Sequence, residues 1–141
     1  GGVQIHGGKD NLVENNLFYN CIAAVSFTQW KEDRWLEELE KPVIRKKIYE
    51  EVDIRSELYQ NKYPELKNIR TGINVNIVKN NLLVDCTHQF LNDNDKKVAE
   101  NNTSVASDGK TVEEFCSPEI LKNYGMKPIP VSKIGPKQVR F

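Results

Sequence analysis

The amino-acid sequence predicts a mainly β fold in which short strands repeat as stacked coils. Three observations predict it: an internal repeat, asparagine pairs at one place in each copy, and short apolar runs beside them. Residues 11–21 and 76–86 agree in chemistry at seven of eleven positions, and a weaker third copy covers residues 98–105. Repeats of this length are typical of stacked architectures such as the parallel β-helix. Each coil of such a fold buries its inner face only when further coils stack on it.

The spacing of the asparagine pairs predicts the length of one coil. Asn80 and Asn101 are 21 residues apart, whereas Asn15 and Asn80 are 65 residues apart. One period of 21 residues leaves an excess of 44 residues, which we interpret as an insertion between two copies. Asparagine tolerates the left-handed backbone conformation of a turn, and stacked asparagine side chains hydrogen-bond to one another. The pairs are therefore expected to mark turns that lie one above another.

The first coil is predicted over residues 1–30, and a helical insertion is predicted over residues 31–71. Apolar residues recur in the insertion at intervals of three or four positions: Leu36 and Leu39, then Ile44, Ile48 and Val52. Such spacing places an apolar stripe on one face of a helix. Pro42 separates two helices, because proline is tolerated in a first helical turn. We expect these helices to lie outside the coils, to pack their stripe on a sheet face and to wall a groove.

Residues 72–109 return to short strands and are predicted to form further coils of the same single domain. The repeat stops beyond them, so residues 110–141 are predicted to form a C-terminal cap and tail. Thr111 and Glu114 fit a capping box, and Ser117 before a proline fits a second helix start. An open coil end exposes unpaired strand edges and core. We therefore expect the cap to cover the open end of the last coil.

Composition and charge exclude several classes of protein. Twenty basic and twenty acidic residues give zero net charge, whereas proteins that bind nucleic acid usually carry a basic excess. Residues 21–25 form the longest purely apolar run, and a membrane span needs about 20 apolar residues. Nucleic acid is therefore not an expected partner, and no membrane span is expected. A structural zinc site is not expected either, because the chain has two histidines and no Cys-x-x-Cys pair.

The cysteines are three in number, so they cannot all pair within the chain. Cys21 and Cys86 occupy the same position in two copies of the repeat, and both are expected to face inward. Adjacent coils would bring them near each other, whereas an intervening coil would separate them. Two reduced thiols that behave as small apolar side chains are favoured over a disulfide.

Several phrases of the sequence resemble right-handed parallel β-helix proteins: residues 5–11, 14–18 and 80–83. That group includes pectate-lyase-like polysaccharide lyases and several β-helical glycoside hydrolases. Residues 29–35 and 62–66 resemble an insertion found in secreted bacterial members of this group. The resemblance implies the last few coils of a longer β-helix, an extracellular or periplasmic location, and a polysaccharide or oligosaccharide partner. The start at Gly1, without methionine or signal peptide, is interpreted as that of a fragment.

The function that the resemblance implies is that of a carbohydrate-active part of a secreted polysaccharide-degrading enzyme. Hydrolysis by a glycoside hydrolase needs two carboxylates that flank the bond. A polysaccharide lyase needs a base and a cation, for which a divalent ion such as calcium would serve, and no other cofactor is expected. Neither set is defined by spacing here, so whether the chain is itself an enzyme stays open. The alternatives are a non-catalytic β-helix module that binds glycan or protein, and a small α+β domain without stacked coils.

The candidate catalytic residue is His6, as a general base. If Val3 and Ile5 point inward, strand alternation points His6 outward. The candidate substrate-binding residues are Lys9, Trp30, Arg34 and Trp35. Aromatic rings stack on sugar faces, and arginine binds carboxylates through two parallel hydrogen bonds. In the simpler interpretation, the histidine faces solvent and the tryptophans anchor the inserted helix. We expect His6 and residues 30–35 to face the same groove.

Overall fold

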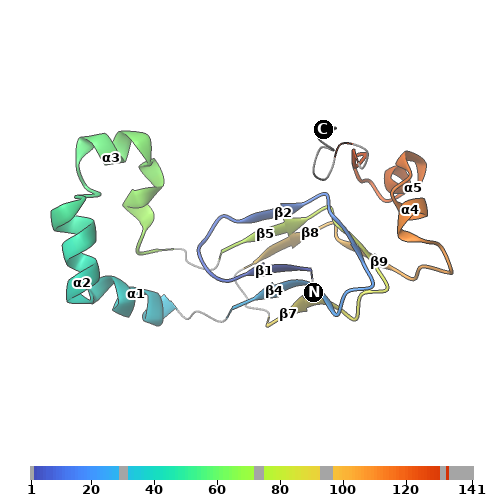
Figure 1. Ribbon diagram of the computed structural model, residues 1–141, viewed down its shortest axis with the longest axis horizontal. Coiled ribbons are helices and arrows are strands. Elements are labelled where there is room, and N and C mark those ends of the chain that lie inside the picture. The colour runs from blue at the N-terminus through green and yellow to red at the C-terminus, as the bar shows by residue number, and fades with distance from the viewer. Residues whose placement is uncertain (1, 29–31, 72–74, 93–96, 131–132, 134–141) are drawn as a thin grey trace, which may run out of the picture.

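The computed structural model describes residues 2–28, 32–71, 75–92, 97–130 and 133. Its strands form three parallel sheets of three strands each, and we call three strands that follow one another along the chain a coil (Figure 1). Coil 1 holds β1 (Val3–Ile5), β2 (Leu12–Glu14) and β3 (Leu17–Tyr19). Coil 2 holds β4 (Ala23–Phe27), β5 (Ile77–Lys79) and β6 (Leu82–Val84). Coil 3 holds β7 (His88–Leu91), β8 (Val98–Glu100) and β9 (Thr103–Val105).

The strand pairing confirms the repeat. Leu12 pairs with Ile77 across β2 and β5, and the same register continues from Ile77 to Val98 in β8. The sheet of β1, β4 and β7 and the sheet of β3, β6 and β9 are parallel as well. The copies that are 65 residues apart in sequence are therefore neighbours in space, and the excess of 44 residues lies between β4 and β5. The strands are therefore stacked, which contradicts the alternative prediction of a small α+β domain that lacks stacked coils.

The asparagine pairs mark the turns, as predicted. The first member of each pair, Asn15, Asn80 or Asn101, has φ between 51° and 57°. The second members form a ladder: Asn16 donates to the Asn81 side chain over 3.1 Å, and Asn81 donates to the Asn102 side chain over 2.8 Å. Asn81 is only 2% exposed. The ladder therefore satisfies polar groups that burial would otherwise leave without partners.

The main core lies between the three sheets. Its buried members include Val13, Phe18, Val78 and Leu83, which alternate with outward-facing residues along their strands. Inward-facing residues of coil 3 are less buried than those of coil 2. Ser104, for example, is exposed, whereas its register partner Leu83 is buried. Coil 3 thus has an open inner face within the described residues.

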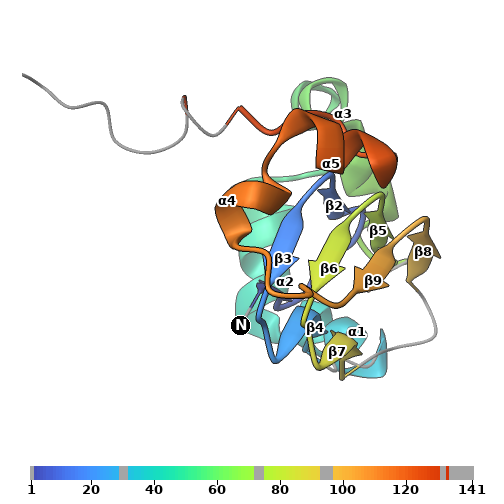
Figure 2. The same ribbon diagram turned by 90° about the vertical axis from the view of Figure 1, so that its right-hand side faces the viewer.

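The C-terminal helices do not cover the end of coil 3, so this expectation was wrong. Helices α4 (Val112–Phe115) and α5 (Pro118–Asn123) lie against the outer face of the β3–β6–β9 sheet (Figure 2). Leu82 and Val84 point outward there and are fully buried beneath the helical residues Phe115 and Leu121. An apolar outer face needs a cover of its own, and this cover lies on the side of the stack.

The starts of both C-terminal helices agree with the sequence analysis. Thr111 and Glu114 form a reciprocal capping box, in which the Thr111 amide donates to the carboxylate over 2.7 Å. The Ser117 hydroxyl accepts a hydrogen bond from the Ile120 amide and caps α5. Beyond α5, the Lys127 amide donates to Asn15 Oδ1 over 2.7 Å and joins the C-terminal segment to coil 1.

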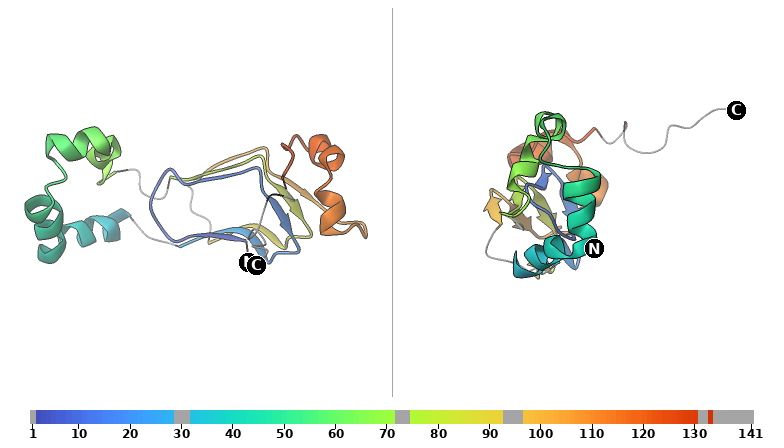
Figure 3. Two further views of the ribbon diagram at one scale, coloured as in Figure 1. Left: turned by 45° about the horizontal axis from the view of Figure 1, so that its top comes forward. Right: turned by 90° about the vertical axis from the view of Figure 1, so that its left-hand side faces the viewer.

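The insertion is helical and projects from the coils as an arm, residues 32–71 (Figures 1 and 3). It contains α1 (Glu32–Glu40), α2 (Pro42–Arg45), the π-helical η1 (Lys46–Glu51), α3 (Glu57–Lys62) and the 3₁₀-helical η2 (Pro64–Asn68). Its helices pack on one another and not on a sheet face, contrary to the prediction. Leu39 is consequently buried, whereas Val52, which was predicted to belong to the same apolar stripe, is exposed.

Helix exceeds strand by residue count, in contrast to the mainly β composition predicted. About 34% of the described residues are helical and about 25% lie in strands. The reason is that each strand has only three to five residues, while the arm and the C-terminal segment are helical. No helix of the described segments has the length and apolar character needed to cross a membrane.

Candidate functional site

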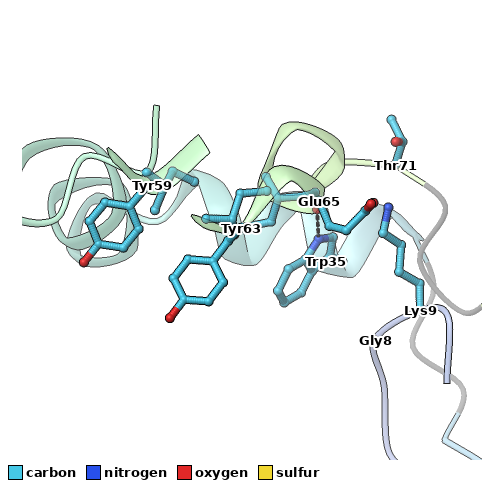
Figure 4. A pocket seen from close by; sticks show the side chains of 10 residues that line it. Gly8, Lys9, Trp35, Tyr59, Tyr63, Glu65 and Thr71 are labelled. Carbon is cyan, nitrogen blue, oxygen red and sulfur yellow. Dashed lines mark hydrogen bonds between the residues drawn. The ribbon is translucent and has the colours of Figure 1, made fainter. Parts of the chain in front are cut away.

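A large cavity lined by described residues lies where the arm meets the turn between β1 and β2 (Figure 4). It is a cavity of about 560 Å³. That volume is in the range of about 300–1,000 Å³ typical of ligand sites. The cavity is lined by Gly8, Lys9, Trp35, Ile54, Tyr59, Tyr63, Glu65, Leu66, Ile69 and Thr71. We call it the Trp35 cavity.

Three aromatic side chains form the walls of the Trp35 cavity. Tyr59 and Tyr63 are four residues apart on α3 and at its end, so the helix presents both rings on one side. Their ring centroids are 6.2 Å apart, and the Tyr63 side of the pair is open to solvent, since that residue is 48% exposed. Trp35 on α1 donates its indole Nε1–H to the Ile69 carbonyl over 2.7 Å. This bond fixes the indole beside the cavity.

Lys9 reaches the Trp35 cavity from coil 1. The turn that carries it is tight, with φ of +85° at Gly8, a conformation that favours glycine, and of +59° at Asp10. The Lys9 ammonium donates to the Asn68 carbonyl over 3.3 Å, and the Asp10 amide donates to the Val75 carbonyl over 2.7 Å. The first bond joins the coil turn to the end of the arm, and the second joins it to the segment that leads into β5. Glu65 and Lys9 both line the rim of the cavity, as the labelled side chains in Figure 4 show.

The predicted site residues are only partly brought together. Lys9 and Trp35 line the same cavity. His6 is exposed and is not among the lining residues, and the same holds for Arg34. Trp30 lies outside the described residues. The structure therefore brings one predicted coil residue and one predicted arm residue to the same cavity, whose described lining does not include His6.

The alternation argument for His6 holds at one neighbour only. Ile5 is buried at 7% exposure, whereas Val3 is 38% exposed. Val3 pairs with Val25 on one side, and no described strand pairs with β1 on its other side. Val3 is exposed because β1 is an edge strand of its sheet. The outward direction of the His6 side chain is therefore supported by the burial of Ile5 alone.

Sequence reasoning missed four polar or aromatic residues of the cavity: Tyr59, Tyr63, Glu65 and Thr71. The pair of tyrosines four positions apart was a usable signal, because a helix presents such residues together. No comparable signal marked Glu65 or Thr71. Their position depends on how η2 returns toward coil 1, which no local pattern specifies.

The chemistry that the Trp35 cavity can perform follows from its polar groups. Glu65 is the only carboxylate among its described lining residues, so the two opposed carboxylates of a glycoside hydrolase are not found in that lining. Within the described part of the chain, histidine, cysteine, aspartate and glutamate do not gather in a group of three or more that could hold a metal ion. The cavity is therefore suited to bind a ligand through aromatic faces and a few rim contacts.

A charge network on the arm joins α1 to the segment that carries Ile69. The Glu40 carboxylate accepts a hydrogen bond from Arg70 over 2.6 Å and another from Arg45 over 2.6 Å. These hydrogen bonds, the one from Arg70 above all, lower the pKa of Glu40. The pKa of Arg70 is raised, first by Glu40 and then by the Tyr49 side chain. Arg70 directly follows the residue that accepts the Trp35 indole bond, so this network supports one wall of the cavity.

Acid is expected to loosen this wall. Because the Glu40 pKa is lowered in the folded protein, its ion pairs contribute above the ordinary value of 4.5 and are lost as the pH falls through the lowered value. Glu40→Gln lacks the charge at every pH. Its tryptophan fluorescence at neutral pH should already resemble that of the acidified natural protein, and it should change less on acidification. Glu51→Gln, which alters a 3.8 Å pair with Lys46, is the control. Identical pH profiles for Glu40→Gln and the natural protein would contradict this expectation.

Comparison of the chain with protein-family models, with curated proteins and with solved structures found no match. No relative therefore assigns a role to the Trp35 cavity.

Proposed function

We propose that this chain is a glycan-binding part of a right-handed parallel β-helix protein that acts on polysaccharides outside the cytoplasm. The parallel register of all three sheets supports such a fold. Connections between parallel strands of one sheet are right-handed in about 98% of cases, which supports a right-handed winding of the coils. The location and the polysaccharide substrate rest on the resemblance of residues 5–11, 14–18 and 80–83 to that group.

The observation that carries the binding role is the combination of aromatic walls and a polar rim in one open cavity. Sugar rings present flat C–H faces, and the rings of Tyr59, Tyr63 and Trp35 offer matching apolar faces. The rim offers Lys9 and Glu65 to sugar hydroxyl groups. A small number of placed polar groups on an apolar floor is the usual composition of a specific ligand site.

Binding and not cleavage is the role that we assign to the Trp35 cavity. Its described lining has one carboxylate, and the candidate base His6 does not reach it. A polysaccharide-degrading protein built in this way would hold the substrate on the arm and cleave it elsewhere. The proposal requires no metal or other cofactor in the cavity.

The test is retardation of the protein in native gels that contain plant, algal or animal polysaccharides. We expect retardation by at least one of them, and an affinity for its oligosaccharides that falls about tenfold in Tyr63→Ala, since a stacking ring contributes on the order of 1 kcal/mol. Tyr124→Ala is the matched control, because Tyr124 is also an exposed tyrosine but follows α5. Absence of retardation by every polysaccharide, or equal losses in both variants, would contradict the proposal.

Product masses test the division between binding and cleavage. The protein is incubated with the polysaccharide that retards it, and the products are measured by mass spectrometry. We expect no new products from this chain alone. Products with added water would indicate a hydrolase, and unsaturated products would indicate a lyase; either result would place catalysis within these residues.

A second candidate, the binding of another protein, is favoured by one observation. Ile54, Leu66 and Ile69 form an apolar floor that would equally accept an apolar side chain of a partner. This candidate predicts that Lys9→Met leaves binding of the partner intact, because the floor would supply most of the contact. Sugar binding predicts a loss in the same variant.

A further inference from the structure

Cys21 and Cys86 lie opposite each other in adjacent coils. Tyr19 pairs with Val84, and Ala23 pairs with His88, so each cysteine stands two residues from both paired positions. Backbone pairing continues through the turn between them, because the Thr87 amide donates to the Cys21 carbonyl over 3.0 Å. Paired chains are about 4.8 Å apart, and disulfide-linked residues have Cα separations of about 4.4–6.8 Å. The backbone is therefore within the range that a disulfide requires.

The side chains of the two cysteines converge on the same stretch of coil 1. Cys21 Sγ lies 3.6 Å from the Tyr19 carbonyl oxygen, and Cys86 Sγ lies 3.6 Å from the Phe18 carbonyl oxygen. The second of these contacts crosses from coil 2 to coil 1. Both side chains also pack against the main core. The sulfur atoms thus face consecutive peptide groups of one strand, although the structure holds both cysteines as free thiols.

We propose that Cys21 and Cys86 form a disulfide that joins coil 1 to coil 2 when the protein meets an oxidising thiol–disulfide buffer. This inference is independent of the glycan-binding proposal. One cysteine thiolate attacks the disulfide of oxidised glutathione and releases one reduced glutathione. The other thiolate attacks the mixed disulfide and releases a second. Two cysteine thiols are oxidised, one glutathione disulfide is reduced to two thiols, and the two cysteine protons pass to the released glutathione.

The disulfide would close a loop that contains the whole arm, because residues 32–71 lie between the two cysteines. It would hold coil 1 to coil 2, from which the arm projects, even if the arm were cut. Both cysteines are only partly buried, so a small oxidant can reach them. Burial raises the pKa of the Cys86 thiol. The link is therefore expected to form faster in mildly alkaline buffer than at neutral pH.

The test begins with the folded chain in a buffer of oxidised glutathione, followed by alkylation of the remaining thiols and mass spectrometry. We expect one alkylated thiol, at Cys116, and a peptide pair linked between Cys21 and Cys86. Limited proteolysis of the arm should then leave fragments that separate only after reduction. The thermal midpoint of the linked protein should exceed that of the reduced protein by several degrees.

Single variants keep this test falsifiable. Cys116→Ser should still form the link, whereas Cys21→Ser and Cys86→Ser should each give no link and no rise in thermal midpoint. Circular dichroism before oxidation shows that each variant is folded. Three alkylated thiols, glutathione adducts that never resolve, or a link that includes Cys116 would overturn the proposal. A link that forms only after unfolding in denaturant would overturn it as well.

Discussion

Replacing Asn81 by alanine is expected to destabilise the protein by about 3 kcal/mol, because several buried polar groups would lose their partners together. The Asn81 Oδ1 atom accepts hydrogen bonds from the Asn16 amide over 2.9 Å and from the Asn16 side chain over 3.1 Å. Its Nδ2 group donates to the Val13 carbonyl over 3.0 Å and to the Asn102 side chain over 2.8 Å. These contacts join all three coils, and Asn81 is 2% exposed, so water cannot replace them without opening the turn.

Urea unfolding followed by circular dichroism measures this loss. Asn11→Ala is the matched control, because the Asn11 side chain also donates to an asparagine of the next coil, Asn76, over 2.8 Å, but Asn11 is exposed. Its backbone amide still donates to Asn76 Oδ1 over 3.3 Å after the substitution. We expect the control to lose less than about 1 kcal/mol. Equal losses of unfolding free energy in the two variants would show that the hydrogen bonds of Asn81 contribute no more to stability than those of Asn11.

Replacing Leu82 by alanine is expected to cost about 3 kcal/mol, since large-to-small substitutions at fully buried leucines leave a cavity. Leu82 points outward from β6, yet it is 0% exposed because the C-terminal helices cover it. The same substitution should weaken the attachment of α4 and α5. The C-terminal segment should then become a preferred site of limited proteolysis while the core between the sheets stays protected.

Leu12→Ala is the control for this second prediction. Leu12 also points outward, from β2, but no helix of the described residues covers it and it is 54% exposed. The two leucines differ in their cover and not in residue type, so we expect a loss within about 0.5 kcal/mol for Leu12→Ala. A similar loss in both variants would mean that the helices contribute little to stability. It would also contradict their position on the side of the stack.

The stacked part of the fold could be predicted because stacking leaves a record in the sequence. Residues that lie above one another meet the same environment, so asparagine returned at the turn and at the ladder position in each copy. The period, the turns, the pairing of residues 65 positions apart and the site of the insertion all followed from that recurrence. The helix starts at Thr111 and Ser117 could also be predicted, because a helix cap involves residues only three positions apart in the sequence.

The candidate site could be predicted only in part. Lys9 and Trp35 were named from residue type, but they meet because the turn after β1 touches the returning end of the arm. His6 is three residues from Lys9, yet it lies outside the cavity. Sequence proximity does not determine which side chains of a turn face a cavity, because the backbone direction changes at each position of positive φ.

By itself, the sequence determined the elements whose causes are local or repeated: the coils, their turns, the place of the insertion and the helix caps. Only the tertiary structure decided what packs against what. The C-terminal helices lie on the side of the stack because Leu82 and Val84 present an apolar outer face there. The arm encloses a cavity because its helices pack on one another and return to coil 1 at Asn68. Such contacts join residues far apart in the chain without a repeating pattern, so apolar burial selects among many partners that local sequence does not distinguish.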